Sequence, residues 1–277
     1  MKKIAVVTMA RNDEFFLNRW VAYYGKEFGQ ENLFVYLDGE DQPVPQFAGK
    51  ANIIRVKHIA EQLIKADKQR SDFLSQKAAE LFETYDLVIG VDADEFLAAD
   101  TKLGKSLAEY LSEIEINTSV SGLGLDVGQN MNCETQLDES QLFLAQRSYA
   151  FVSSRYTKSN VISKPLHWGS GFHRVKGHNF KIDENLYLFH FGCVDYKMIM
   201  QRFNDKDRTG TGWTGHIKKR LRTISFITKK RAKDGDKWLS IARIFQTLIR
   251  PVYAMNKPSM ACWRLVVKLP ERFGNIV

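Results

Sequence analysis

YDLVIGVDADEFL, residues 85–97, is the stretch of sequence that decides the fold. Its apolar run from Leu87 to Val91 is typical of a strand buried on both faces, as in a parallel sheet. The run ends in three carboxylates, Asp92, Asp94 and Glu95, which repel one another and are costly to bury unpaired. A divalent cation would remove that cost, and open α/β sheets bind ligands at the C-terminal edge of their strands. We therefore interpret the stretch as a metal and diphosphate centre.

A turn is the alternative interpretation of the same stretch. Asp92 or Asp94 would then cap a following helix. The buried strand before the carboxylates, together with the N-terminal segment described below, favours the metal site.

Strand-like and helix-like segments alternate through the first hundred residues. Apolar strands are predicted at 3–9, 32–37 and 52–56, and helically spaced apolar residues predict helices from residue 15 and around 74–85. The alternation predicts an α/β fold with a Rossmann-like, mostly parallel sheet flanked by helices. The first, second and fourth strands end in polar or acidic residues, so we expect those tips to converge on one crevice.

The pattern changes after residue 97. A helix is expected around 103–114, followed by strand-like stretches at 120–127, 142–144 and 149–152. Because long crossover helices are missing between these stretches, we expect antiparallel strands added to the sheet.

Composition bounds the class of protein. The 277 residues are 44% hydrophobic and 26% charged, as in soluble globular proteins. Three cysteines without metal-site spacing favour a reducing compartment. No apolar run reaches about 18 residues, and the N-terminal apolar stretch is too short for a signal peptide. We expect a cytoplasmic protein, free or peripheral on the inner face of the cell membrane.

The net charge of +8 is concentrated in one segment. Nine Lys and Arg against two Asp between residues 216 and 237 give that segment a charge of +7. An amphipathic helix rich in aromatic residues follows at 238–249, so residues 216–250 suit an anionic membrane surface. A C-terminal helix packed on the body is the alternative. The rest of the chain is nearly neutral, and no nucleic acid partner is expected.

Common phosphate-binding loops are missing from the sequence. No Gly-x-Gly-x-x-Gly follows the first strand, and there is no Walker A loop. A nucleotide is still able to bind through Asp38 at the end of the second strand, although Asp38-Gly39 also fits a plain turn. Arg11 and Arg70 are candidates to share the charge of a diphosphate.

Residues 156–175 are rich in glycine, histidine and aromatic residues. Tyr156 and Trp168 beside polar groups suit a sugar, whereas a surface loop with a packed tryptophan is the alternative. His190 lies within an aromatic strand and is either a core histidine or a metal ligand. Residues 209–215 are interpreted as a lid or an interdomain hinge.

Three stretches together resemble family-2-type glycosyltransferases of the GT-A fold, in the bacterial branch with an Asp-x-Asp-Glu-Phe signature. They are Thr8–Glu14, Trp20–Tyr24 and Val91–Leu97. The resemblance covers residues 1 to about 100. It is weaker from about 120 to 203, where Tyr156-x-Lys158, Trp168–His173 and Phe189–Phe191 echo the acceptor half, and it lapses beyond about 215.

The resemblance implies a role for particular residues. Nucleotide-sugar binding is implied for Ala10, Arg11, Glu14 and Asp38, with Arg70 and Asp92 beside the diphosphate. Mn²⁺ or Mg²⁺ would be held by Asp92, Asp94 and His190. Acceptor binding is expected of Trp168, Tyr156 and Lys158. The chain would divide into a catalytic domain, 1–212, with a nucleotide-sugar half (1–100) and an acceptor half (101–212), and a basic helical extension, 213–277. Asp38-Gly39 replaces a longer Asp-x-x-Ser/Thr run, which leaves the base open.

The implied reaction is transfer of a sugar from a nucleotide-sugar donor, expected to be a UDP-sugar, to a hydroxyl of a glycan or lipid-linked glycan. Cell-surface polysaccharide or lipopolysaccharide synthesis is the expected setting. The metal would neutralise the leaving diphosphate. An inverting reaction needs a general base, and Asp126, His173 and Asp195 are the candidates, with His173 preferred because it lies in the acceptor-like stretch.

Two other functions fit parts of the sequence. A metal-dependent phosphohydrolase or nucleotidyltransferase also uses clustered aspartates, but a nucleophilic aspartate is missing at Thr8–Ala10. A membrane- or nucleic-acid-binding protein acting through the basic tail is the non-enzymatic alternative.

Overall fold

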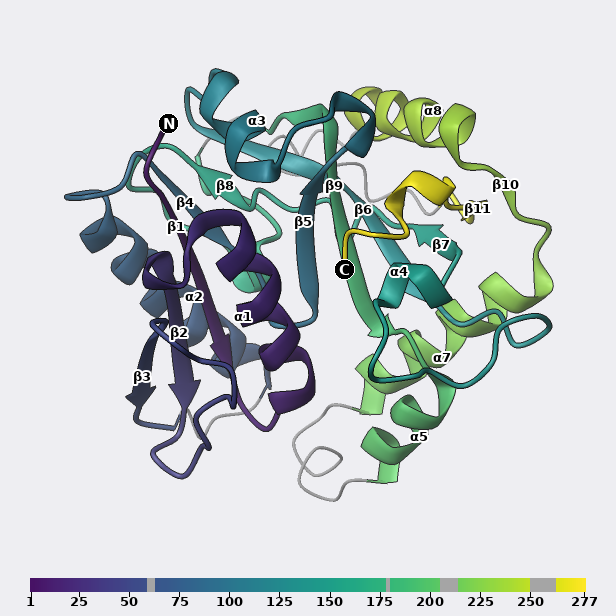
Figure 1. The fold of residues 1–277 in the computed structure, drawn as a ribbon, viewed down its shortest axis with the longest axis horizontal. Helices are drawn as coiled ribbons and strands as arrows, with labels where there is room; N and C mark the ends of the chain where they lie inside the picture. The colour runs from purple at the N-terminus through teal and green to yellow at the C-terminus, as the bar shows by residue number, and fades with distance from the viewer. Residues whose placement is uncertain (59–62, 178–179, 205–213, 250–262) are drawn as a thin grey trace.

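The computed structural model describes residues 1–58, 63–177, 180–204, 214–249 and 263–277. The strands form one mixed sheet in the order β10-β11-β7-β6-β8-β4-β1-β2-β3, with β9 beside β6 and β5 beside β9. Helices flank this sheet (Figure 1), so the predicted α/β class is confirmed. The predicted lid falls outside the described residues, except for Thr214 and Gly215, which begin a helix.

The N-terminal part of the sheet is parallel. Its strands are β3 (Asn52–Val56), β2 (Leu33–Asp38), β1 (Ile4–Ala10) and β4 (Leu87–Gly90). All neighbouring pairs among them run parallel. Their C-terminal ends therefore meet at one edge of the sheet, as the sequence predicted.

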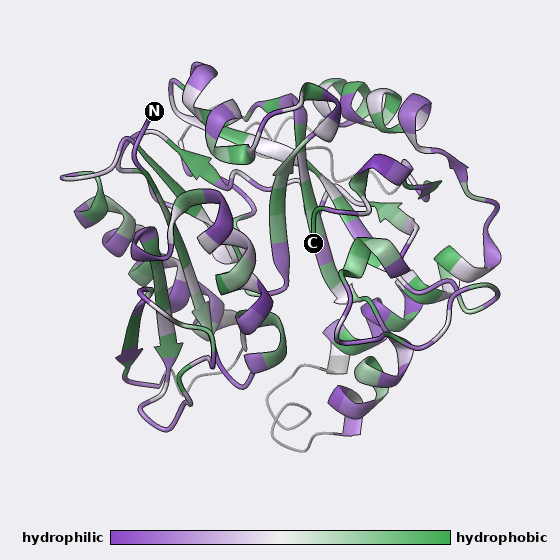
Figure 2. Cartoon of the chain, viewed as in Figure 1, coloured by the Kyte–Doolittle hydropathy of each residue, from purple (hydrophilic) through white to green (hydrophobic). Residues whose placement is uncertain are grey.

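Strand β1 explains why this part of the sequence is so apolar. All seven of its residues are buried. Ile4 and Val6 contact the core beneath α1 (Glu14–Phe28), while Val7 and Met9 contact the core beneath α2 (Leu63–Leu81). A strand covered on both faces has no polar side, which is why it reads as a continuous hydrophobic run. Figure 2 shows the hydrophobic residues concentrated on these strands.

The second part of the sheet is mostly antiparallel, as expected. It contains β5 (Glu95–Ala99), β6 (Ser119–Gly128), β7 (Tyr149–Val152), β8 (Val161–Ile162), β9 (Ile182–Cys193), β10 (Lys233–Asp234) and β11 (Val266–Lys268). Strand β8 pairs antiparallel with both β4 and β6 and so joins the two parts. The β6–β9 and β10–β11 pairs are parallel.

Five helices in the described ranges complete this part. They are α3 (Leu107–Glu113), α4 (Phe143–Gln146), α5 (Tyr196–Asn204), α7 (Thr214–Lys229) and α8 (Gly235–Leu248). Single 3-10 turns lie at η1 (Gln30–Asn32), η2 (Thr101–Leu103), η3 (Ser170–Phe172) and η5 (Glu271–Phe273). Helix α3 begins with a capping box, in which Ser106 and Glu109 each accept from the other's backbone N–H.

Two sequence expectations need correction. Residues 142–144 were expected to be strand-like, but Phe143 and Leu144 begin α4 and bury their side chains in the main core. So short an apolar run does not distinguish strand from helix. On α8 the buried positions are Gly235, Leu239, Ala242 and Gln246. Only Ala242 of these belongs to the apolar stripe that the sequence predicts, which consists of Trp238, Ile241, Ala242, Phe245, Leu248 and Ile249.

The C-terminal segments pack on the body. Strand β11 pairs with β7, and α7 contacts β6, β7 and β9. The proposed boundary at residue 212 remains a prediction. None of the helices in the described ranges combines the length and the hydropathy that a membrane span requires.

Candidate functional site

The acidic stretch lies at the C-terminal edge of β4, in a turn that leads into β5. The turn of the alternative interpretation is therefore present, but a strand follows it, so neither Asp92 nor Asp94 caps a helix. Glu95 is fully buried and Asp94 is 7% exposed. Three carboxylates thus lie close together in a largely dry setting, where each needs a partner.

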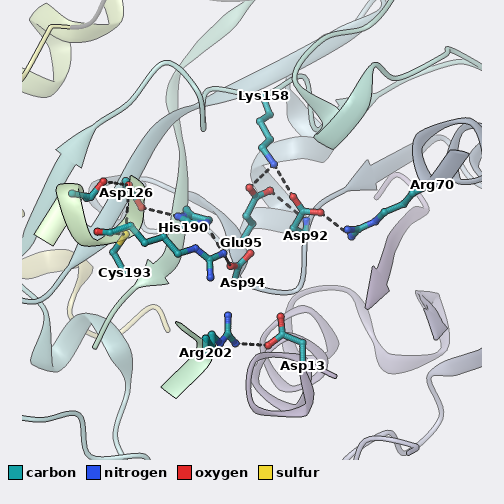
Figure 3. Close-up of polar contacts among 12 residues, drawn as sticks. Asp13, Arg70, Asp92, Asp94, Glu95, Asp126, Lys158, His190, Cys193 and Arg202 are labelled. Carbon is teal, nitrogen blue, oxygen red and sulfur yellow. Dashed lines mark hydrogen bonds and ion pairs between the residues drawn. The ribbon is translucent and has the colours of Figure 1, made fainter. Parts of the chain in front are cut away.

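Asp92 is held by two basic side chains. Its Oδ1 accepts from the Arg70 guanidinium on α2 at 2.8 Å, and its Oδ2 accepts from Lys158 Nζ at 2.8 Å (Figure 3). Lys158 also forms an ion pair with Glu95 at 2.5 Å. Burial alone would raise the pKa of Asp92, but Lys158 and Arg70 lower it to about 2. Asp92 is therefore ionised at neutral pH.

Lys158 stands between two carboxylates and is almost completely buried. Burial would lower the pKa of Lys158, but Asp92 and Glu95 raise it above its usual value. Burial raises the pKa of Glu95 to about 7, against the opposing effect of Lys158. Glu95 therefore holds a proton more readily than Asp92, whose pKa is lowered.

Asp94 has a separate set of partners. Its Oδ2 lies 3.0 Å from the Arg220 guanidinium on α7 and 3.4 Å from His190 Nε2 on β9. His190 Nδ1 lies 2.7 Å from Asp126 Oδ1 on β6, and the Tyr156 ring stacks on the imidazole with centroids 3.7 Å apart. Burial lowers the pKa of His190, but Asp94 and Asp126 raise it to about 9.

The acidic crowding is balanced by the protein's own cations. Arg70, Lys158, Arg220 and His190 face the four carboxylates of Asp92, Asp94, Glu95 and Asp126. We call these eight residues the central network. The carboxylates therefore do not need a metal ion to relieve their mutual repulsion.

The donor atoms fit a metal ion only in part. Asp94 Oδ2 and His190 Nε2 face each other at 3.4 Å. Asp92 is not in this pair, because both its oxygens accept from basic groups. In the described part of the chain, no group of three or more His, Cys, Asp and Glu is arranged to hold a metal. An ion bound by Asp94 and His190 would take its remaining ligands from phosphate and water, as Mg²⁺ commonly does.

The residues implied in nucleotide binding line the neighbouring strand ends. Ala10 ends β1 and Asp38 ends β2. The Arg11 guanidinium donates to the Asp38 carbonyl at 2.6 Å and makes two bonds to Asp41. Glu14 begins α1 and lines an open pocket. Asp13 and Arg202, which form an ion pair, line the same pocket. These residues and Asp92 thus follow one edge of the sheet.

The candidate general bases differ in their surroundings. Asp126 is buried and accepts from Thr223 as well as contacting His190. Burial, reinforced by Lys158, lowers the pKa of His173 to about 3, so its imidazole is a weak proton acceptor. Asp195 accepts from the Leu137 and Met198 backbone N–H groups and from Arg147. Those contacts give Asp195 a structural role.

The expected acceptor residues are mostly interior. Trp168 is fully buried, donates from Nε1 to the Ser159 carbonyl, and packs against Phe172. It has no exposed face for a sugar, so the packed-tryptophan alternative holds here. Lys158 belongs to the central network, and Tyr156 lies against His190.

Sequence reasoning missed Arg220. It was counted as part of the basic tail, but it lies on the same face of α7 as Ile217, Ile224 and Ile227, which are buried. A cation at i+3 within an apolar stripe is a signal that the helix turns it inward. That periodicity was present in the sequence.

Comparison with known proteins adds little to this geometry. No protein-family model matches the chain, and no curated protein is similar to it in sequence. One similar solved structure is a glycosyltransferase involved in the glycosylation of the major capsid of PBCV-1. It is 12% identical over 44% of this chain and 50% of that one, with a TM-score of 0.26. Another is mannose-1-phosphate geranyltransferase from Thermus thermophilus, 11% identical over 99% of this chain and 77% of that one, with a TM-score of 0.32. Likenesses this weak do not identify the reaction of this chain.

Proposed function

We propose that this protein is a glycosyltransferase that moves a sugar from a nucleotide-sugar donor to a hydroxyl of a glycan. The observation that carries the proposal is the convergence of Arg11, Asp38, Arg70 and Asp92 on the C-terminal edge of adjacent parallel strands. That edge is where open α/β sheets bind their ligands. The Asp-x-Asp-Glu-Phe sequence at the same edge supports a nucleotide diphosphate over other ligands.

The donor would lie along this edge. Asp38 and Arg11 at the ends of β2 and β1 suit the base and ribose, and Glu14 begins the helix that follows β1. Arg70, between Met9 and Asp92, is placed to meet the diphosphate. A UDP-sugar remains the proposed donor.

Cationic side chains would stabilise the leaving group. As the bond between the anomeric carbon and the diphosphate oxygen breaks, negative charge grows on that oxygen. Arg70 and Lys158 are pre-oriented by Asp92, so little reorganisation is needed when the charge appears. If Mn²⁺ or Mg²⁺ binds, Asp94 and His190 would hold it, and it would supply further Lewis-acid neutralisation of the diphosphate.

The acceptor hydroxyl must lose its proton as its oxygen bonds to the anomeric carbon. Of the three proposed bases, Asp126 lines a cavity in the described part of the chain. Asp195 is engaged structurally, and the pKa of His173 is too low for efficient proton transfer at neutral pH. Asp126 is therefore the base we propose, with His190 as its positioning residue.

The decisive experiment measures donor binding and turnover separately. Calorimetric titration with a set of nucleoside diphosphates, in Mn²⁺, Mg²⁺ or EDTA, reports the donor class. Turnover is followed as released nucleoside diphosphate and as glycan extension. Asp92→Asn and Asp94→Asn are each expected to lower transfer by about 100-fold or more. Asp86→Asn, at the opposite end of β4, is the matched control and is expected to retain wild-type activity.

The results distinguish the competing functions. Release of phosphate without glycan extension would support a phosphohydrolase, and formation of a nucleoside diphosphate sugar would support a nucleotidyltransferase. Full transfer activity in both Asp92→Asn and Asp94→Asn would refute the proposed site.

A further inference from the structure

A cavity separate from the strand-end edge lies between residues 151–156 and helix α7. Its volume is about 250 Å³. Five basic side chains line it: Arg155, His216, Lys219, Arg220 and Arg222. Among the described residues, Asp126 is the sole acid in the lining, and it already accepts from Thr223 and contacts His190. We call this space the basic cavity.

Three cations of the basic cavity have no acidic partner among the described residues. No carboxylate of the described residues lies within 4 Å of Arg155, Lys219 or Arg222. By contrast, Arg220 on the same helix is paired with Asp94. The pKa of His216 is lowered, first by burial and then by the positive charges of Lys219, Arg220 and Arg155. Several like charges around one hollow repel one another, and an anion placed among them relieves that repulsion.

Aromatic side chains form the other part of the lining. Phe151 and Phe226 stack with centroids 5.8 Å apart, and Trp263 and Tyr156 also face the cavity. Tyr156 in turn lies on His190 of the central network. The cavity is therefore an aromatic and cationic space in contact with the proposed base, Asp126, and distinct from the strand ends proposed for the donor.

We propose that the basic cavity binds the acceptor as an anionic sugar, with a phosphate held by the basic side chains and a sugar ring against the aromatic ones. This inference rests on the proposed function, because it names the acceptor class of the same reaction. The volume is sufficient for a monosaccharide phosphate but not for an extended glycan, so only the end of a longer acceptor would enter. The nearest hydroxyl would then face Asp126.

The probe is glucose 6-phosphate, titrated calorimetrically into the full chain, with glucose and inorganic phosphate in parallel. We expect glucose 6-phosphate to bind more tightly than either. The double variant Lys219→Glu/Arg222→Glu is expected to weaken it at least tenfold. Both side chains are exposed, so the fold should be retained, and circular dichroism checks this. The control is Lys164→Glu, at an exposed lysine outside the cavity, which changes the charge by as much as each of the two cavity substitutions does. This variant is expected to bind glucose 6-phosphate as the wild type does.

A milder pair guards against a folding artefact. Lys219→Gln/Arg222→Gln should lose an intermediate part of the glucose 6-phosphate affinity. Lys219→Arg/Arg222→Lys, which keeps both positive charges, should retain that affinity. UDP binding is expected to be unchanged in all these variants. Wild-type affinity in Lys219→Glu/Arg222→Glu, equal affinity for phosphate and glucose 6-phosphate, or displacement of glucose 6-phosphate by UDP would each overturn the proposal.

Failure of this inference is separable from failure of the proposed function. If UDP binds and sugar is transferred while the cavity variants behave as wild type, only the acceptor site is wrong. If no nucleoside diphosphate binds but glucose 6-phosphate binds through Lys219 and Arg222, the cavity is an anionic-sugar site and the transferase proposal is wrong.

Discussion

The central network and the basic cavity share Asp126 and Arg220, and Tyr156 of the cavity stacks on His190 of the network, yet the two regions differ in how their charges are paired. In the network every carboxylate faces a cation from another element, so the charges fix geometry without any ligand. In the cavity Arg155, Lys219 and Arg222 have no acidic partner in the described ranges. The difference teaches that paired charges organise the site, while unpaired charges of one sign indicate where a ligand belongs.

The largest expected effect comes from breaking the network at its most buried cation. Lys158→Met leaves Asp92 and Glu95 without their shared partner, and removing one member of a buried ion pair costs about 3–5 kcal/mol. Denaturant unfolding measures the loss. Lys77→Met, which removes an exposed pair with Glu80, is the control and should cost about 0–1 kcal/mol. Equal losses in the two variants would contradict the network's structural role.

A second substitution disturbs both regions together. A Cβ added at Gly124 on β6 would overlap the Tyr156 carbonyl carbon and the Thr157 nitrogen. Because backbone atoms cannot rotate away, Gly124→Ala must displace the segment that carries Tyr156 and Lys158. We expect a loss of about 1–3 kcal/mol, together with weaker glucose 6-phosphate binding. Gly215→Ala, where an added Cβ meets nothing within 4 Å, is the control.

A pH experiment tests whether an ion pair outside the site behaves like those inside it. Burial raises the pKa of Asp100, but Arg272 and the Lys102 N–H lower it below its usual value. A lowered folded-state pKa stabilises the protein above the unfolded pKa, and this stability disappears as the pH falls through the folded pKa. Arg272→Met should therefore cost about 1–2 kcal/mol at pH 7 and progressively less in acid. Lys105→Met, at an exposed pair, should show no such convergence with the wild type.

Salt gives the smallest effect and sharpens the same contrast. Exposed, unpaired cations are screened by added salt, whereas buried pairs are screened much less. Raising the salt concentration should weaken glucose 6-phosphate binding several-fold and change the unfolding midpoint little. A parallel fall in both quantities would show that the two regions do not differ in the way proposed.

The parallel part of the fold was predictable because its hydrophobic pattern shows which strands are covered on both faces. Strand β1 is apolar throughout since both faces are covered, and the acids at the end of β4 mark the ligand edge. The approach of Asp94 to His190 was likewise expected and is present in the structure.

The partners of those acids were not predictable from local pattern. Lys158 and Arg220 lie 66 and 126 residues from the aspartates that they contact. Periodicity indicates that Arg220 faces inward, but it does not encode which acid Arg220 meets, because that depends on how β6, β9 and α7 pack. The prediction that Trp168 binds a sugar was wrong for a similar reason. An aromatic residue in a polar stretch is compatible with either a sugar-binding surface or a core position.

Helix α7 also has a consequence for how the molecule is made. Arg220 leaves the ribosome 126 residues after Asp94, and Thr223 leaves it 97 residues after Asp126. The parallel strands are able to assemble early during synthesis, but Asp94 gains its arginine and Asp126 its hydroxyl donor only after α7 has been made. Acquisition of the finished centre is thus tied to the synthesis of α7.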